Sequence, residues 1–224
     1  MREITHHSSL FRMTDLSHDP AYFLELQTRT GWGAMLRSFA SWLDPKPASL
    51  ILDVGTGPGL LPAIFAQNGC RTIGIDYTQE MFNNALHPNL VLASVFSLPF
   101  KSATFDLITA SNLLFLLPDP RAALIEMTRL LKPNGEIGLL NPSEQMSVAA
   151  ATALADEREL TGLARETLLN YASRAERHFR WGVGELESLF SSAGCQLTAT
   201  KPKMGAGLVR FARASLHKTE PQQA

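Results

Sequence analysis

The sequence predicts an α/β fold built around a parallel sheet, and two observations carry that prediction. Between Ser49 and about Leu140, short runs of β-favouring residues alternate with segments whose apolar residues recur at helical spacing. This alternation is typical of βαβ units. The chain has 224 residues, of which 45% are hydrophobic and 18% are charged. Such a chain can bury a sizeable core, so we expect one domain with an insertion rather than two domains.

Short apolar runs predict five strands in this region, at residues 50–54, 72–76, 90–93, 105–110 and 137–141. Helices are expected between them, because large apolar residues repeat there every three or four positions. The first helix begins near Leu60 and ends before Gly69. A second is expected after Thr78, with its apolar face at positions 81, 82, 85 and 86, and another begins at Asp119-Pro120.

The flanking segments are predicted to be mostly helical. One or two amphipathic helices precede Ser49, and the segment 142–178 is expected to hold two or three inserted helices that break near Thr161-Gly162. A helix ended by Gly194 and two strands, near 196–200 and 208–212, close the chain. We therefore expect a single domain over residues 1–216 and a disordered tail at 217–224. Within the domain we expect N-terminal helices, a core, a helical lid and closing elements, at residues 1–48, 49–141, 142–180 and 181–216.

The composition disfavours several classes of function. The formal net charge is −1, and the basic group at Arg174, Arg177 and Arg180 is too small for the surface of a nucleic-acid-binding protein. Cys70 and Cys195 have no partner at metal-ligand spacing, so no metal site is expected. No apolar run approaches the length of a membrane span, and the N-terminus lacks the apolar core of a signal peptide. We expect a cytoplasmic protein with no nucleic acid partner and no membrane span.

The most informative segment is Asp53-Val54-Gly55-Thr56-Gly57-Pro58-Gly59-Leu60, which follows a predicted strand and opens a predicted helix. Glycines there let the backbone turn sharply and approach a ligand closely. A tight turn with no ligand would use the same residues. Seventeen residues beyond Gly59, however, the second strand ends in Asp76, whose carboxylate can accept hydrogen bonds from both hydroxyls of a ribose. Together the two signals predict a site for a nucleoside-containing cofactor.

The spacing of the glycines argues against a dinucleotide. The dinucleotide fingerprint places glycine at the first, third and sixth positions, and the sixth position here is Leu60. A carboxylate at Asp53 also suits a pyrophosphate poorly, whereas it suits the cationic amino acid end of S-adenosylmethionine. A nicotinamide-dependent oxidoreductase is therefore the less favoured alternative.

Taken together, these motifs resemble those of class I S-adenosylmethionine-dependent methyltransferases, in particular the small-molecule group that includes the ubiquinone/menaquinone C-methyltransferases. The similarity runs from roughly Ser49 to Asn141 and recurs weakly over the last strands. It rests on residues 52–59, Gly74-Ile75-Asp76, Leu98-Pro99-Phe100, Phe105-Asp106-Leu107-Ile108 and Leu130-Leu131-Lys132-Pro133-Asn134-Gly135. The resemblance implies a Rossmann-like, seven-stranded, mostly parallel sheet with helices on both faces and an antiparallel last strand. It also implies a reaction that converts S-adenosylmethionine to S-adenosylhomocysteine.

The resemblance further implies cofactor-binding residues in four groups. The turn around the methionine moiety comprises Asp53, Gly55, Thr56, Gly57 and Gly59; Asp76 binds the ribose; Tyr77, Met81, Ser94, Val95 and Phe96 surround the adenine; and Ser111, Asn112 and Leu113 lie beneath the cofactor. Ser94 stands where the family usually has an acidic residue that accepts from the adenine amino group, so a weaker bond is expected. Core packing remains the alternative for Tyr77 and Met81, and a backbone hydrogen bond at the start of its strand is expected of Asp106.

Methyl transfer from a sulfonium is an in-line displacement with a neutral leaving group, so the protein has mainly to align the acceptor and exclude water. A base is needed only when the acceptor must lose a proton. His178 is the best single candidate for that base, and a position on the surface is its alternative. We expect a small, partly apolar acceptor between the N-terminal segment and the insertion, near Tyr22, Trp32, Phe115, Asn141 and Tyr171, with Phe11 and Met13 also in the first segment. Loop packing is the alternative for Phe115. A cofactor-binding regulatory or partner protein without turnover is the alternative function.

Overall fold

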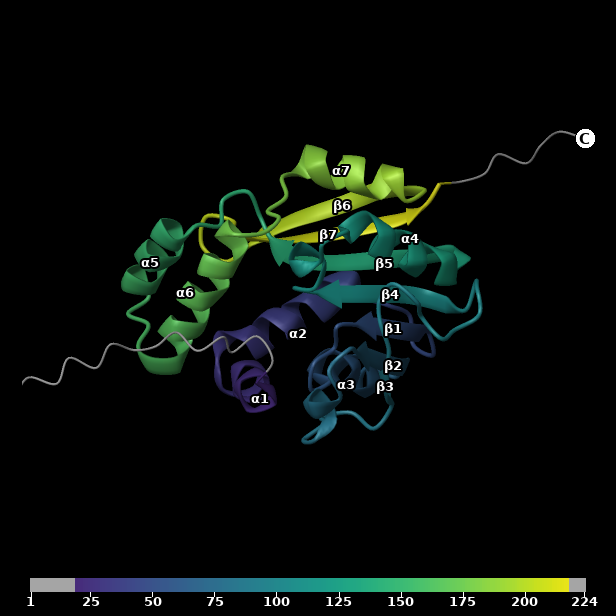
Figure 1. Cartoon of the computed structure of the whole chain (residues 1–224), viewed down its shortest axis with the longest axis horizontal. Coiled ribbons are helices and arrows are strands. Elements are labelled where there is room, and N and C mark those ends of the chain that lie inside the picture. The colour runs from purple at the N-terminus through teal and green to yellow at the C-terminus, as the bar shows by residue number, and fades with distance from the viewer. Residues whose placement is uncertain (1–18, 218–224) are drawn as a thin grey trace, which may run out of the picture.

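The structure, a computed structural model, describes residues 19–217 and contains a seven-stranded sheet in the order β3-β2-β1-β4-β5-β7-β6 (Figure 1). Strands β1 (Leu50–Val54), β2 (Arg71–Asp76), β3 (Leu90–Leu92), β4 (Phe105–Ser111) and β5 (Leu131–Pro142) run parallel. Strands β6 (Cys195–Lys203) and β7 (Val209–Leu216) are antiparallel to each other, and β7 is antiparallel to β5. The predicted Rossmann-like sheet with an antiparallel last strand is confirmed.

Helices cover both faces of this sheet. Helix α3 (Leu60–Gln67) connects β1 to β2, and α4 (Pro120–Leu130) connects β4 to β5. The two connections leave the centre of the sheet in opposite directions, so right-handed crossovers place the two helices on opposite faces. Helix α2 (Gly31–Leu43) packs beside α3, and α7 (Val183–Ser192) packs beside α4. The expected helical layers are therefore both present.

Local sequence signals fix where several of these elements begin and end. The Asp119 carboxylate accepts from the N–H of Ala122 at 2.9 Å and thereby caps α4, as predicted. Gly69 follows α3 with a φ of 80°, in the left-handed region that glycine adopts freely. Asp106 accepts from the N–H of Leu50 at 2.8 Å, which ties the starts of β1 and β4 together. The backbone hydrogen bond expected of Asp106 is thus confirmed.

The helix predicted after Thr78 is replaced by a shorter turn. The chain forms only the 3-10 helix η2 (Gln79–Phe82) before it continues irregularly to β3. The Thr78 side chain caps nothing; its N–H is instead held by the Asp76 carboxylate at 3.0 Å. Residues 83–88 include two asparagines, a histidine and a proline, which disfavour a longer helix. The prediction of a full helix there was wrong, because these residues disfavour a helix more strongly than the apolar spacing favours one.

Three further helices gather at the edge of the sheet where the parallel strands end (Figure 1). Helix α1 (Pro20–Arg29) precedes α2, while α5 (Val148–Glu157) and α6 (Gly162–Glu176) form the insertion after β5. Helix α6 packs against both α1 and α5. The predicted break is present at Gly162, whose φ is 52°. The insertion thus holds two helices, and with α1 it lies over the edge at which open α/β sheets bind ligands.

Arg213 joins the last strand to the N-terminal helices. Its Nη2 donates to the carbonyl oxygens of Trp42 and Leu43 at 2.7 and 2.6 Å. Its guanidinium also lies 5.2 Å from the centre of the Trp42 ring. Because the last carbonyls of a helix have no partner within the helix, the arginine caps α2 and holds it against β7.

Part of the sequence prediction falls on residues 1–18 and 218–224, which lie outside the described residues. Phe11, Met13 and most of the predicted tail are among them. Within residues 19–217, no helix is long and apolar enough to cross a membrane. The same part of the chain contains no cluster of three or more histidine, cysteine, aspartate or glutamate side chains that could hold a metal ion.

Candidate cofactor and acceptor site

The candidate site lies where the neighbouring strands β1 and β4 end. Their connections diverge to opposite sides of the sheet, which is the position at which open α/β sheets bind ligands. The segments that follow the two strands meet there, because a Cβ on Gly55 would lie 3.1 Å from the side chain of Leu113. The Asn112 N–H donates to the Leu140 carbonyl at 2.7 Å, which fixes this loop to β5. The structure thus brings Ser111, Asn112 and Leu113 beside the glycine turn.

The glycine turn directs its N–H groups into the protein. Gly55 and Thr56 both donate to the Ile75 carbonyl at 2.9 Å, Gly57 donates to Asp76 Oδ2 at 2.9 Å, Gly59 donates to the Thr56 carbonyl at 3.2 Å, and Pro58 has no N–H. A pyrophosphate is held by backbone N–H donors at such a turn. Since residues 55–59 have already used theirs, the turn itself suits a dinucleotide poorly, in agreement with the argument from Leu60.

Among the three glycines of the turn, Gly57 is the least crowded. A Cβ on Gly74 of β2 would lie 2.8 Å from the side chain of Thr56, so that side chain is packed against the sheet. A Cβ on Gly59 would lie 3.2 Å from His87, which makes Gly59 a packing residue as well. Gly57 has a φ of 56°, and the nearest atom to its Cβ position is 3.6 Å away. Thr56 and Gly59 can therefore reach a ligand only through their backbone.

Asp76 connects the turn to the end of β2. One carboxylate oxygen accepts from Gly57 at 2.9 Å and the other accepts from Thr78 at 3.0 Å. Each carboxylate oxygen has two lone pairs, so Asp76 keeps an acceptor site on each oxygen for further donors. The side chain is partly exposed. This is the arrangement that a ribose diol requires.

Asp53 lies buried beneath the turn and is 2% exposed. Thr109 of β4 donates to its Oδ1 at 2.7 Å. Burial raises the pKa of Asp53 to about 7; the nearby Asp76 carboxylate adds to the rise, and the hydrogen bond from Thr109 opposes it. The carboxyl is therefore poised to ionise when a cation approaches from above.

Buried amides without hydrogen-bond partners also occur in this part of the structure. Asn112, at a φ of 55°, accepts from the Tyr171 hydroxyl at 2.6 Å, yet its Nδ2 has no partner among residues 19–217. Within the same range, both amide atoms of Asn141, at the end of β5, are buried and unpaired, and so is Oε1 of Gln27 on α1. Buried polar groups nearly always have partners in native proteins. These three amides therefore indicate polar ligand groups or water at this edge of the sheet.

The predicted adenine contacts divide into exposed and buried groups. Tyr77 is 80% exposed and Phe96 is 44% exposed, whereas Met81 and Val95 are buried. The Ser94 hydroxyl accepts from the N–H of Phe96 at 3.3 Å, within its own turn. Tyr77 is therefore not a core residue, while Met81 packs in the interior. Tyr77 directly follows β2, which ends at Asp76, and Phe96 follows β3, the strand that pairs with β2.

Aromatic residues from three distant segments meet beside the insertion. The ring centres of Trp32 and Tyr171 are 5.3 Å apart, and those of Phe115 and Tyr171 are 5.8 Å apart. The His178 ring lies edge-on to Phe115 at 6.3 Å. Burial raises the pKa of Tyr171 well above its usual value, so this hydroxyl stays protonated. We call these four residues the aromatic cluster.

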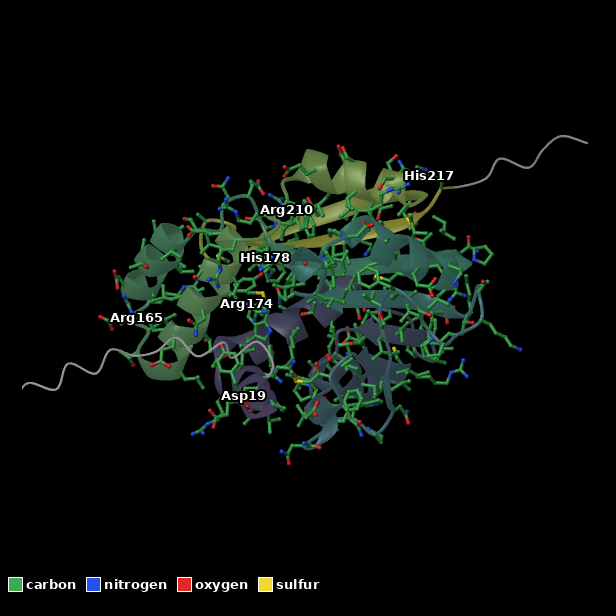
Figure 2. The ribbon with its side chains drawn as sticks, in the orientation of Figure 1. Asp19, Arg165, Arg174, His178, Arg210 and His217 are labelled. Atoms are coloured by element: carbon green, nitrogen blue, oxygen red, sulfur yellow. The ribbon has the colours of Figure 1, made fainter. Side chains whose placement is uncertain are left out.

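His178 and Tyr22 lie at the margins of this region. His178 is exposed just after the end of α6 (Figure 2), as the alternative interpretation anticipated, although its ring contacts Phe115. Tyr22 is half-buried on α1, where burial raises its pKa and a hydrogen bond with Asn170 of α6 opposes the rise. Tyr22 thus faces the lid helix α6.

Sequence reasoning missed two polar residues of the site. Thr109 interrupts an otherwise apolar strand, and this interruption was a usable signal, because a polar residue there needs a partner. Gln27 belongs to no motif, and only the packing of α1 reveals that it is buried. Both residues contact or face the glycine-turn region from other segments of the chain.

The sheet order is that of a Rossmann-like fold, and the glycine turn with its two carboxylates fits a nucleoside-containing ligand. Residues 52–139 match the family model described as a methyltransferase domain. The resemblance to class I methyltransferases drawn from the sequence is confirmed, and the family implies S-adenosylmethionine as cofactor. The matched segment covers β1 to most of β5; helices α1, α2, α5 and α6 lie outside it.

Individual relatives support the same class. A demethylmenaquinone methyltransferase of Corynebacterium kroppenstedtii is 35% identical over 97 residues, which cover 42% of each chain. Nocamycin O-methyltransferase of Saccharothrix syringae is 35% identical over 118 residues, covering 47% of this chain and 42% of that one. The matches thus span less than half of the length of these relatives. In fold, the chain is similar to a chain of the complex between the Haloferax volcanii Trm112 methyltransferase activator and a methyltransferase, with a TM-score of 0.68, 16% identity, and 92% and 97% of the two chains covered.

Proposed function

We propose that this protein transfers a methyl group from S-adenosylmethionine to a small, partly apolar molecule. The observation that carries the proposal is the glycine turn between β1 and α3. The N–H groups of residues 55–57 donate to β2, and the carboxylates of Asp76 and Asp53 lie beside the turn and beneath it. A ribose diol and a cationic amino acid fit two carboxylates, whereas a pyrophosphate does not. The match of residues 52–139 to a methyltransferase domain supports the same cofactor.

In this proposal the chain's own residues bind and orient the cofactor. Asp76 accepts from the ribose hydroxyls, and the backbone of residues 55–57 lines the methionine moiety with Asp53 beneath it. Tyr77 and Phe96 offer exposed rings for the adenine, with Met81 and Val95 packed behind them. The Ser111–Leu113 segment lies beneath the cofactor. When bound, S-adenosylmethionine supplies a methyl group on a sulfonium and leaves as S-adenosylhomocysteine.

The acceptor site in this proposal is formed by the aromatic cluster of Trp32, Phe115, Tyr171 and His178. Apolar rings with a few convergent polar groups are typical of small-molecule sites, and the unpaired amides of Asn112 and Asn141 can supply those polar groups. Three of the four rings lie outside residues 52–139, the segment matched by the family model. Relatives with comparable matches carry a quinone name and a nocamycin name. The acceptor is therefore set by this chain's own helices rather than by the shared segment.

Catalysis in this proposal rests on alignment and on exclusion of water. Helices α1 and α6 lie over the strand ends. Two reactants held in the right orientation react faster, because their translational and rotational entropy has already been lost on binding. Tyr171 serves as a hydrogen-bonding group that orients Asn112, since its raised pKa keeps the hydroxyl protonated. His178 serves as the base when the acceptor must lose a proton, and it reaches the cluster through its contact with Phe115.

The proposal includes a single domain over residues 1–216 that acts in the cytoplasm, without a nucleic acid partner. The two cysteines, Cys70 and Cys195, are free and buried, as is usual for proteins of a reducing compartment. The net charge of −1 argues against nucleic acid as the acceptor.

A ligand titration followed by a turnover assay tests the proposed function. S-adenosylmethionine and S-adenosylhomocysteine should raise the melting temperature, because a ligand at 100 times its Kd adds roughly 2.7 kcal/mol of stability. NAD, the control ligand, should leave it unchanged. Acceptors are then screened by the release of S-adenosylhomocysteine. Stabilisation by NAD alone would refute the proposal, and binding with no turnover of any acceptor would favour a regulatory protein.

A further inference from the structure

Gln27 places an unsatisfied amide inside the region where α1 approaches the glycine turn. The residue is 9% exposed, and its Oε1 makes no hydrogen bond within the described part of the chain. A buried amide oxygen without a donor destabilises the folded state, because its bond to water is lost and not replaced. The protein bears this cost at a single position of α1, a helix whose remaining described residues are exposed or half-buried.

The bend between α1 and α2 fixes the backbone from which the Gln27 side chain extends. The Thr30 hydroxyl accepts from the N–H of Trp32 at 3.2 Å and donates to the carbonyl of Leu26 at 2.6 Å. Any Cβ on Gly33 would overlap the carbonyl oxygen of Gln27, so the two helices meet where only glycine fits. The backbone position of Gln27 is therefore fixed by the close packing of α1 on α2.

Gln27 lies directly beside Gly57. Its Nε2 is 3.6 Å from the position of a Gly57 Cβ, which is van der Waals distance, and it is the one neighbour from another segment of residues 19–217 within 4 Å of that position. The N–H of Gly57 donates to Asp76. The amide of α1 is therefore adjacent to the buried backbone of the turn.

We propose that Gln27 binds the amino acid end of S-adenosylmethionine, as a further cofactor residue contributed by α1. The proposal rests on the proposed function. An amide offers an acceptor and a donor from one position, so Oε1 accepts from the ammonium group while Nε2 donates to the carboxylate. A charged side chain would attract one of these groups and repel the other. Helix α1 thereby contributes to the cofactor site as well as to the group of helices that lies over the strand ends.

Calorimetric titration with two ligands tests this assignment. S-adenosylhomocysteine carries the amino acid end, whereas 5′-methylthioadenosine has the same nucleoside and lacks that end. Gln27→Ala should weaken S-adenosylhomocysteine binding by about tenfold to a hundredfold, as expected for hydrogen bonds to charged groups. Binding of methylthioadenosine should stay unchanged. Gln27→Met, which keeps the length of the side chain without its amide, should behave in the same way and covers the case in which the alanine variant fails to fold.

Thr28→Ala is the matched control, since Thr28 is exposed on the same helix and its hydroxyl donates to the carbonyl of Leu24. It should bind both ligands as the natural chain does. Wild-type affinity for S-adenosylhomocysteine in both Gln27 variants would overturn the inference. Equal loss of both ligands would overturn the assignment to the amino acid end. A natural chain that binds neither ligand would instead refute the proposed function.

Discussion

The buried carboxyl of Asp53 should make the stability of this protein fall as the pH rises, and Asp53→Asn should abolish that part of the fall. Burial raises the pKa of Asp53 from 3.8 to about 7 in the folded protein. The folded state therefore holds this proton more tightly than the unfolded state does. Its contribution to stability is complete below about pH 4 and is lost as the pH rises through about 7.

The size of this effect follows from the pKa shift. Each pKa unit corresponds to about 1.4 kcal/mol. Between about pH 5 and pH 8, the ionisation of Asp53 should remove roughly 2 to 3 kcal/mol from the free energy of unfolding. Asparagine has nearly the same shape, carries no titratable proton and keeps an oxygen that can accept from Thr109. The variant should therefore gain stability over the natural chain as the pH rises.

Urea unfolding followed by circular dichroism at about pH 5, 6.5 and 8 measures this difference directly. Other titrating groups, such as His87, act equally in both proteins and cancel in the comparison. Thr109→Val is the companion variant, because it removes a hydrogen bond that favours the ionised form and should move the loss of stability to higher pH. A pH-independent difference between the natural chain and Asp53→Asn would refute the reasoning.

Three further tests concern ligand binding and turnover. Asp76→Ala should weaken S-adenosylhomocysteine binding at least about tenfold, since it removes charge-assisted hydrogen bonds; an unchanged Kd in calorimetry would remove the ribose assignment. Gly57→Val, at a φ of 56°, should abolish binding while circular dichroism retains the helical signal; normal binding would place the cofactor elsewhere. Trp32→Ala and Tyr171→Ala should each slow methyl transfer by about tenfold or more and should impair transfer far more than cofactor binding; unaltered kinetics in both would disprove the acceptor site.

The parts of the molecule that the sequence predicted well are those encoded by neighbouring residues. The turn at 53–60 can be recognised from the sequence, because glycine spacing, a preceding apolar run and a following helical pattern occur within a few residues. The cap at Asp119-Pro120 and the break at Gly162 are local in the same sense. Such features need no knowledge of the rest of the chain.

The parts that the sequence could not specify depend on long-range packing. Thr109 and Asp53 are 56 positions apart, and their hydrogen bond exists only because β1 and β4 are neighbours in the sheet. Trp32 and Tyr171 were both predicted at the acceptor site, but nothing in the sequence indicated that their rings touch. The segment after Thr78 was predicted wrongly for a local reason. Its apolar residues have helical spacing, but the asparagines and the proline that follow disfavour a helix, and only a short 3-10 turn forms.

The contact of Arg213 with α2 has a consequence for the order in which the molecule is completed. A chain emerging from the ribosome presents its N-terminal part first, so the glycine turn and β4 are available long before Arg213 is made. The end of α2 gains its cap only when the final hairpin of β6 and β7 has formed. Helix α2, which carries Trp32 of the aromatic cluster, therefore receives its last stabilising contact only after nearly the whole chain has been made.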